Sequence, residues 1–254
     1  MKRILLLSLV AIILTFHPTS AATPSLLPWD KEWTITQVQE LLSAGADVSA
    51  RDDNGCTPLI RAAAHNDNPE VIKALLDAGA DVNARTVDGW TPLMSASRND
   101  NPEGIKVLLA AGANVNAQDN EGWTPLTFAA SLNTNSKVIK VLLDAGADVN
   151  ARNSIGCTPL LNAAMLNSNS EILILLLVAG AEVDTQSVDG TTPLMAAACS
   201  NTNPEVIKVL LAAGANGSLK SLEGKTAFQY AKENVDLVNT DAYWALLRSI
   251  STYR

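Results

Sequence analysis

Apolar residues recur along most of the chain as pairs of short helical patterns. The first pattern of one pair begins at Thr57, a good N-cap, and the proline that follows loses no hydrogen bond at the first helical position. The second pattern begins at Asn68 and ends at Gly79, a residue that tolerates the left-handed conformation of a helix terminus. An Asp-Gly pair then turns the chain back. The pattern therefore predicts two helices, a tight turn between them, and a hairpin finger.

This unit repeats with an almost constant period. The triplet Thr-Pro-Leu, degenerate in its last copy, recurs at spacings of 34, 33, 34, 34 and 34 residues. The glycine of a second marker, Ala-Gly-Ala, follows the same spacings. Two markers that share one period, including its single shortening, indicate a repeat array whose units stack to bury apolar faces that none could bury alone. The threonines are Thr57, Thr91, Thr124, Thr158, Thr192 and Thr226.

The repeated unit resembles the ankyrin repeat. The similarity rests on Asp-Gly-Trp-Thr-Pro-Leu at 88–93 and Val-Leu-Leu-Ala-Ala-Gly-Ala-Asn-Val-Asn at 107–116, and on their copies in the other repeats. It implies an all-α solenoid of helix-turn-helix units joined by hairpin fingers. In the second helices we expect Leu109 and Leu143 to be buried between repeats.

The resemblance also suggests how the domain is divided. It covers residues 33–254, with a half repeat at 33–53, five full repeats at 54–222 and a capping repeat at 223–254. The cap carries charged residues on its outer parts, as a terminal repeat needs for solubility. We find no second domain.

The sequence departs from the family pattern in two places. The family usually has a histidine directly after Thr-Pro-Leu, and its side chain bonds back into the turn. This chain has mostly apolar residues at that position, so we expect apolar contact to replace the polar interaction. Four of the five full repeats also carry one extra residue, which we place in the inter-helix turn. The residues that replace the histidine are Ile60, Met94, Thr127, Leu161 and Met195.

The N-terminus has the pattern of an export signal. A basic start is followed by a 13-residue run, 4–16, that is apolar apart from Ser8 and Thr15, and then by small residues up to Ala22. A membrane anchor is the alternative, but the run is shorter than the roughly 20 apolar residues of a spanning helix. We therefore expect residues 1–22 to be a cleaved signal peptide, 23–32 a linker or N-terminal cap, and the product to be periplasmic or secreted without stable membrane insertion.

Charge narrows the choice of partners. The chain has 18 Lys and Arg against 26 Asp and Glu, a formal net charge of −8, and signal cleavage would remove two further positive charges. Proteins that bind nucleic acid need a basic surface to displace counterions from phosphates, so we expect no nucleic-acid partner.

Aromatic residues make up only 4% of the chain, which predicts thin core layers of Ala, Leu, Val and Ile.

The residues needed for most catalytic sites are absent. After signal cleavage His65 is the only histidine, and we interpret it as a solvated surface side chain. Neither phosphate-binding glycine motif occurs, and one histidine with three scattered cysteines supplies no zinc site. We expect the recurring aspartates after the Ala-Gly-Ala marker, such as Asp81, to fix turns rather than to act as paired acids. We therefore expect no enzyme activity, catalytic residue, metal or cofactor.

The three cysteines are too far apart for a disulfide within the chain. Cys56 and Cys157 occupy the same slot three repeats apart, a separation of roughly 30 Å at about 8–10 Å per repeat. A disulfide needs Cα atoms within about 7 Å. Cys199 lies late in a first helix, where we expect a small core residue. A reactive thiol or a bond between chains at Cys56 or Cys157 is the less favoured alternative.

The resemblance places the binding surface on a concave face formed by the finger tips and the exposed sides of the first helices. Trp90 and Trp123 fill a finger slot that holds Cys, Thr or Lys elsewhere, and Phe128 departs similarly from its equivalents. We expect these three side chains to form an exposed patch, because such patches mark contact sites. In the alternative, each tryptophan packs on the next finger. The candidate binding residues are Arg61, Asp88, Trp90, Asn120, Glu121, Trp123, Phe128 and Ile155.

These observations favour a monomeric, non-enzymatic protein-binding module, a scaffold or protective partner. Acidic finger tips favour a partner with basic groups. The first alternative is an immunity-type inhibitor of an envelope-targeting enzyme, the second an enzyme of unknown type, and the third an envelope spacer. The surface of a repeat array does not identify the partner.

Overall fold

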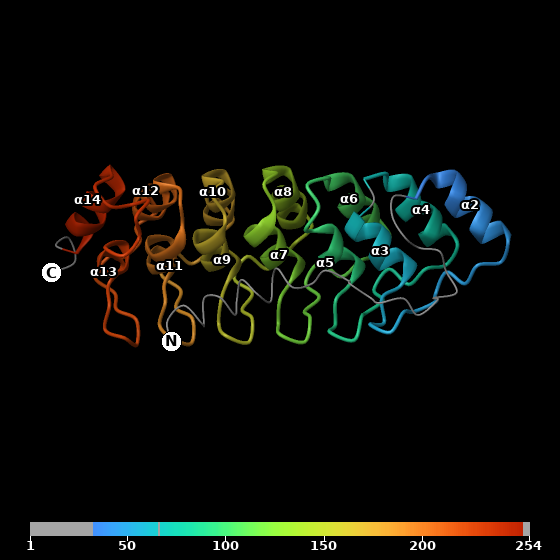
Figure 1. Ribbon diagram of the computed structural model, residues 1–254, viewed down its shortest axis with the longest axis horizontal. Helices are drawn as coiled ribbons and strands as arrows, with labels where there is room; N and C mark the ends of the chain where they lie inside the picture. Colours follow the sequence, from blue (N-terminus) through green and yellow to red (C-terminus); the bar gives the residue numbers. More distant parts are fainter. Residues whose placement is uncertain (1–32, 66, 251–254) are drawn as a thin grey trace.

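A computed structural model describes residues 33–65 and 67–250, which form thirteen helices and contain no β-strand. The expected signal peptide and linker lie outside these residues. The helices form two layers, and loops project from the inner layer as a row of fingers (Figure 1). The prediction of an all-helical repeat solenoid is confirmed.

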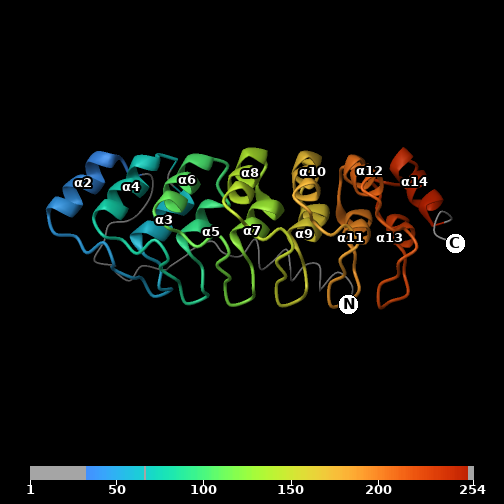
Figure 2. The same ribbon diagram turned by 180° about the vertical axis from the view of Figure 1, so that it is seen from behind.

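Each repeat after the N-terminal half repeat contributes one helix to each layer, and the half repeat contributes only α2 to the outer layer (Figure 1, Figure 2). The inner layer, beside the fingers, contains α3 (Pro58–His65), α5 (Pro92–Ala96), α7 (Pro125–Leu132), α9 (Pro159–Leu166), α11 (Pro193–Ser200) and α13 (Ala227–Ala231). The outer layer contains α2 (Ile35–Ser43), α4 (Pro69–Asp77), α6 (Pro102–Ala110), α8 (Ser136–Asp144), α10 (Ser170–Val178), α12 (Pro204–Ala212) and α14 (Asp241–Ser249).

The helix boundaries follow the residues that predicted them. In the second repeat, Thr91 Oγ1 accepts a hydrogen bond from the Met94 amide at 3.3 Å. Asn101 Oδ1 accepts one from the Glu103 amide at 3.0 Å, and Gly112 ends α6 with φ +89°. The aspartates after the glycines also fix turns as expected, since Asp81 Oδ1 accepts a bond from the Asn83 amide at 2.9 Å.

The core runs between the two layers along the whole array. Leu108 and Leu142 are completely buried there, whereas Leu109 and Leu143, which we expected in this role, are only half-buried at its edge. The core positions of α6 are Ile105 and Leu108, three residues apart, so our register was wrong by one residue.

The slot that holds histidine in the typical family pattern is filled by buried side chains. Met94, for example, is completely buried, and its four equivalents are at most 3% exposed. Thr127 instead makes a hydrogen bond, with its hydroxyl 2.9 Å from the hydroxyl of Thr124. The expected apolar replacement is therefore confirmed in four of the five repeats.

A ladder of buried asparagines, which the sequence pattern did not predict, joins successive inter-helix turns. Asn167 is 5% exposed, and its Nδ2 donates to Ala130 O at 3.0 Å and to Asn133 O at 2.8 Å in the preceding repeat. Asn133, Asn201 and Asn234 make equivalent bonds. Because amide donors satisfy carbonyls that no helix partner reaches, the ladder holds neighbouring repeats in register.

The repeat with the single 33-residue spacing has a short first helix. α5 has five residues, whereas α3, α7, α9 and α11 each have eight. The additional residue of the longer repeats thus extends the first helix, and our placement of it in the turn is corrected. In the short repeat the chain leaves the helix at Ser97, and Arg98 lies in the turn beyond it.

Candidate functional site

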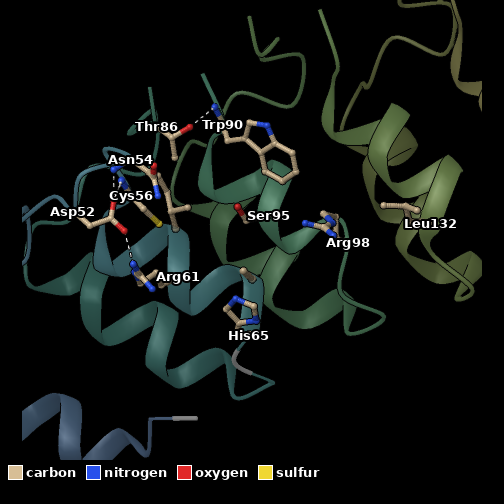
Figure 3. Close-up of a pocket in the computed structure, with 12 residues that line it drawn as sticks. Asp52, Asn54, Cys56, Arg61, His65, Thr86, Trp90, Ser95, Arg98 and Leu132 are labelled. Atoms are coloured by element: carbon tan, nitrogen blue, oxygen red, sulfur yellow. Dashed lines mark hydrogen bonds and ion pairs between the residues drawn. The ribbon is translucent and has the colours of Figure 1, made fainter. Parts of the chain in front are cut away.

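We call the finger tips and the adjoining side of the inner helices the finger face. A cavity of about 370 Å³ lies near its N-terminal end, between the first two fingers, α3, α5 and α7. Its lining combines apolar side chains such as Ile60 and Leu132 with charged ones from α3 and from the turn after α5 (Figure 3). This volume is within the range of small-ligand sites, at roughly 300–1,000 Å³.

Arg61 and Asp52 form an ion pair at one wall of this cavity. The Arg61 guanidinium of α3 reaches the Asp52 carboxylate at the base of the first finger, and both side chains are largely shielded from solvent. The other Asp52 oxygen accepts a hydrogen bond from the Cys56 amide at 2.8 Å. The charge of Arg61 is therefore balanced within the protein.

Arg98 lies at the opposite wall, over the ring of Trp90, with 5.5 Å between the guanidinium carbon and the ring centroid. None of the carboxylates in the described part of the chain forms an ion pair with it. Arg98 is exposed, and partial desolvation lowers its pKa, but a guanidinium stays protonated at neutral pH. The cavity thus contains one positive charge that no described acidic group balances.

His65 lies between the two arginines in the close-up view and is exposed, as expected (Figure 3). Its pKa is lowered, first by partial desolvation and then by the positive charges of Arg61 and Arg98. At neutral pH the imidazole is therefore neutral, and it contributes hydrogen-bonding groups rather than charge.

Ser95 supplies a second polar group to the cavity. The residue is only 3% exposed and lines the cavity from α5, and its hydroxyl makes no hydrogen bond with any other described residue. Ser97, two residues later, instead donates to Leu93 O at 2.7 Å. A hydroxyl on such a cavity wall can bond to a group that enters the cavity.

The three aromatic residues singled out in the sequence do lie together. Phe128 is the centre of the cluster, with its ring centroid 4.5 Å from that of Trp90 and 5.2 Å from that of Trp123. Trp123 and Phe128 are buried, at 3% and 4% exposure, and pack with Met94. The expectation of an exposed patch is therefore wrong for these two residues. Trp90 alone is half-buried and lines the cavity.

The finger tips form a continuous row, which we call the tip row, through backbone hydrogen bonds between neighbouring fingers. The Asn120 amide donates to Asp88 O at 3.0 Å, and the Val188 amide donates to Ile155 O at 3.0 Å. Asn120 also donates from Nδ2 to Val87 O at 3.0 Å. Since each tip is tied to its neighbour, side chains along the row keep fixed relative positions.

This row exposes both acidic and apolar side chains. Val87, Ile155, Val188 and Leu222 are 69%, 39%, 70% and 81% exposed, and the last three belong to consecutive fingers. Exposed acidic residues lie beside them at Asp53, Asp88, Glu121, Asp189 and Glu223. At Asp189, partial burial acts to raise the pKa, but hydrogen bonds from Ser187 and Thr191 outweigh it and the pKa is lowered.

The candidate residues thus divide into three groups. Arg61 and Trp90 line the cavity, Asp88, Asn120, Glu121 and Ile155 belong to the tip row, and Trp123 and Phe128 are buried.

Sequence reasoning missed Arg98, Ser95 and the cavity itself. The single 33-residue spacing was the available indication, because it marks the repeat whose first helix is short.

The cysteines differ in burial. Desolvation raises the pKa of Cys56 to about 11 and that of Cys157 to about 12. Cys199 is half-buried in α11, so it is less enclosed than the core residue we expected.

In residues 33–65 and 67–250 we find no cluster of three potential metal ligands. No helix in these same ranges is long and apolar enough to cross a bilayer.

Comparison with known families agrees with the repeat geometry. A family model described as "Ankyrin repeats (3 copies)" matches residues 34–119, 112–187 and 160–250, which together cover most of the chain. No curated protein matches the sequence.

Proposed function

The chain belongs to the ankyrin repeat family, whose repeats generally mediate protein–protein interaction, and from this premise we propose that it is a non-enzymatic scaffold or protective binding partner. The observation that carries this proposal is the tip row of the finger face. It combines fixed backbone geometry with exposed apolar side chains on three consecutive fingers. Apolar groups held in this way favour contact with another protein.

The charges of the tip row suggest what kind of protein is bound. Acidic side chains accompany the apolar ones on three of the four fingers that expose an apolar side chain, for example Asp189 beside Val188 and Glu223 beside Leu222. A partner with basic groups around an apolar surface complements this pattern. We propose that the protein is a monomer, so that the whole row faces this partner.

Affinity capture with paired variants tests this proposal. The tip variant replaces Ile155, Val188 and Leu222 with serine. The matched control replaces Ile174 and Val178 with serine, because these apolar side chains are 46% and 82% exposed on α10 of the outer layer. We expect mass spectrometry to find a protein captured by the native chain and by the control but lost with the tip variant. Loss with the control alone would overturn the proposal.

The same experiment distinguishes the inhibitor alternative. If the captured protein is an envelope-targeting enzyme whose activity falls in proportion to added repeat protein, the binding module is an immunity-type inhibitor. Unchanged activity leaves the scaffold function. Interaction modules of this family are typically non-enzymatic, and we propose the same for this chain.

We also propose that the protein is exported and is periplasmic or secreted. The support is the basic start and the short apolar run within residues 1–22, which lie outside the described residues. N-terminal sequencing of the protein from its native cells should begin at Ala22 or Thr23. A membrane-bound product that retains Met1 would favour the anchor instead.

A further inference from the structure

The cavity at the N-terminal end of the finger face differs in charge from the tip row. Arg98 is its only arginine without a carboxylate partner among the described residues, because Arg61 is paired with Asp52. Asp52 and Arg61 offset each other, so the charged groups of the lining leave one net positive charge. A group with a single negative charge therefore fits better than a doubly charged phosphate.

The geometry around Arg98 suits a carboxylate. Its guanidinium presents fixed donors beside the Trp90 ring, and such donors match the two oxygens of a carboxylate. Ser95 lines the same cavity, and its hydroxyl has no other hydrogen-bond partner among the described residues. Two kinds of donor can thus act on one entering anion.

The rest of the lining requires an apolar group in the same ligand. Ile60, Leu132 and Trp90 form an apolar part of a space of about 370 Å³, which a carboxylate alone would leave largely unfilled. In a C-terminal residue, the carboxylate and the side chain leave the same Cα atom, so both can enter one cavity. An internal acidic residue instead brings chain on both sides and little apolar surface.

We propose that this cavity binds the C-terminal residue of the partner chain, with its carboxylate at Arg98 and an apolar side chain against Trp90, Ile60 and Leu132. The inference rests on the proposed binding function and names the part of the partner that is recognised. The tip row then contacts the basic and apolar surface of the same partner.

Three N-acetylated hexapeptides test the proposal directly. The first is Gly-Ser-Gly-Ser-Gly-Phe with a free carboxylate, the second is its C-terminal amide, and the third is Gly-Ser-Glu-Phe-Gly-Ser with an amidated end. Each is titrated to millimolar concentration into ¹⁵N-labelled protein, and the Trp90 indole and Arg98 Nε signals are followed by NMR. We expect the free acid to shift these signals and to bind at least tenfold more tightly than either amidated peptide.

Variants locate the interaction. Arg98→Gln should weaken binding of the free acid at least tenfold, whereas Arg98→Lys, which keeps the charge, should recover part of it. Lys140→Gln removes one exposed positive charge from α8 in the outer layer and should leave binding unchanged. Circular dichroism of each variant checks that the helices remain intact.

Several results would overturn the assignment. Equal binding of the free acid and its amide would remove the role of the carboxylate. Tighter binding of the internal Glu-Phe peptide would show that the cavity recognises an acidic side chain rather than a C-terminus. If no peptide shifts the Trp90 and Arg98 signals, the cavity is excluded as a site. The titration needs no native partner, so its failure is separate from failure of the capture experiment, which depends on the tip row.

Discussion

Replacement of Asn167 by aspartate tests the buried ladder that joins the repeats. The side chain is 5% exposed and donates two hydrogen bonds to the preceding repeat, at 3.0 and 2.8 Å, while its Oδ1 accepts one from the Asn169 amide at 2.9 Å. Asn167→Asp keeps the size and the acceptor but removes both donors. Two carbonyl oxygens then face a carboxylate instead of an amide.

The expected cost follows from these bonds. Each lost hydrogen bond removes about 0.5–1.5 kcal/mol, and a buried acceptor left without a donor adds a desolvation penalty of about 1–3 kcal/mol. With both carbonyls affected beside a buried charge, we expect the free energy of unfolding to fall by about 3–5 kcal/mol at pH 7.

The effect should depend on pH. Burial and the two facing carbonyl oxygens raise the pKa of the introduced carboxyl, and its protonated form can donate one of the lost bonds. The destabilisation is therefore smallest below the ordinary aspartate pKa of about 3.9, and it grows as pH rises through the raised value of the folded state.

Urea unfolding provides the measurement, followed by circular dichroism and by tryptophan fluorescence so that coincident transitions establish two-state behaviour. Asn120→Asp is the matched control, because Asn120 also donates from Nδ2 to a carbonyl of the preceding repeat but is exposed. Its cost should stay within about 1 kcal/mol. Similar costs for the two variants, or a difference from the native chain that does not change between pH 3.5 and pH 7, would refute the reasoning.

Further variants test burial along the array. In urea unfolding, Leu108→Ala should lower the free energy of unfolding by about 2–5 kcal/mol, and Leu109→Ala, at the edge of the core, by less than half of that loss. Trp123→Ala should cost about 3–5 kcal/mol of stability, whereas Trp90→Ala should cost less in the same unfolding measurement but weaken peptide binding in the NMR titration. Because burial raises the pKa of Cys157 to about 12, its thiol should react with a disulfide reagent at pH 8 at least tenfold more slowly than in urea.

The fold was predictable because local residue choices repeat at a fixed spacing. Thr91 and Asn101 cap their helices, and Gly112 ends one, through bonds and backbone angles that depend on only a few neighbouring residues. Interactions between repeats were harder to predict. In the sequence, Asn68 marks only the start of a second helix, yet Asn167 in a later inter-helix turn reaches carbonyls 34 and 37 positions earlier.

The candidate site was predicted only in part, because side-chain exposure depends on how closely adjacent repeats approach. Trp123 and Phe128 stand out equally with Trp90 in the sequence, but the ring of Phe128 packs between the other two and is buried with Trp123. Arg98 gave no motif to recognise. Its position beside the cavity follows from where α5 ends, which spacing alone does not place in three dimensions.

Insertion of one alanine between Ser97 and Arg98 tests whether the short period creates the cavity. The insertion gives this repeat the 34-residue spacing of its neighbours, and we expect α5 to extend from five residues towards the eight of the equivalent helices. Because the added turn of helix moves the guanidinium away from the Trp90 ring, binding of the free-acid hexapeptide should fall at least tenfold in the NMR titration. Stability in urea should not fall, since the inserted residue follows the pattern of the other repeats. Insertion of one alanine after Asn239, in the turn before α14, serves as a control for lengthening the chain and should leave peptide binding unchanged. Retained peptide binding in a variant whose α5 is longer would show that the period and the cavity are unrelated.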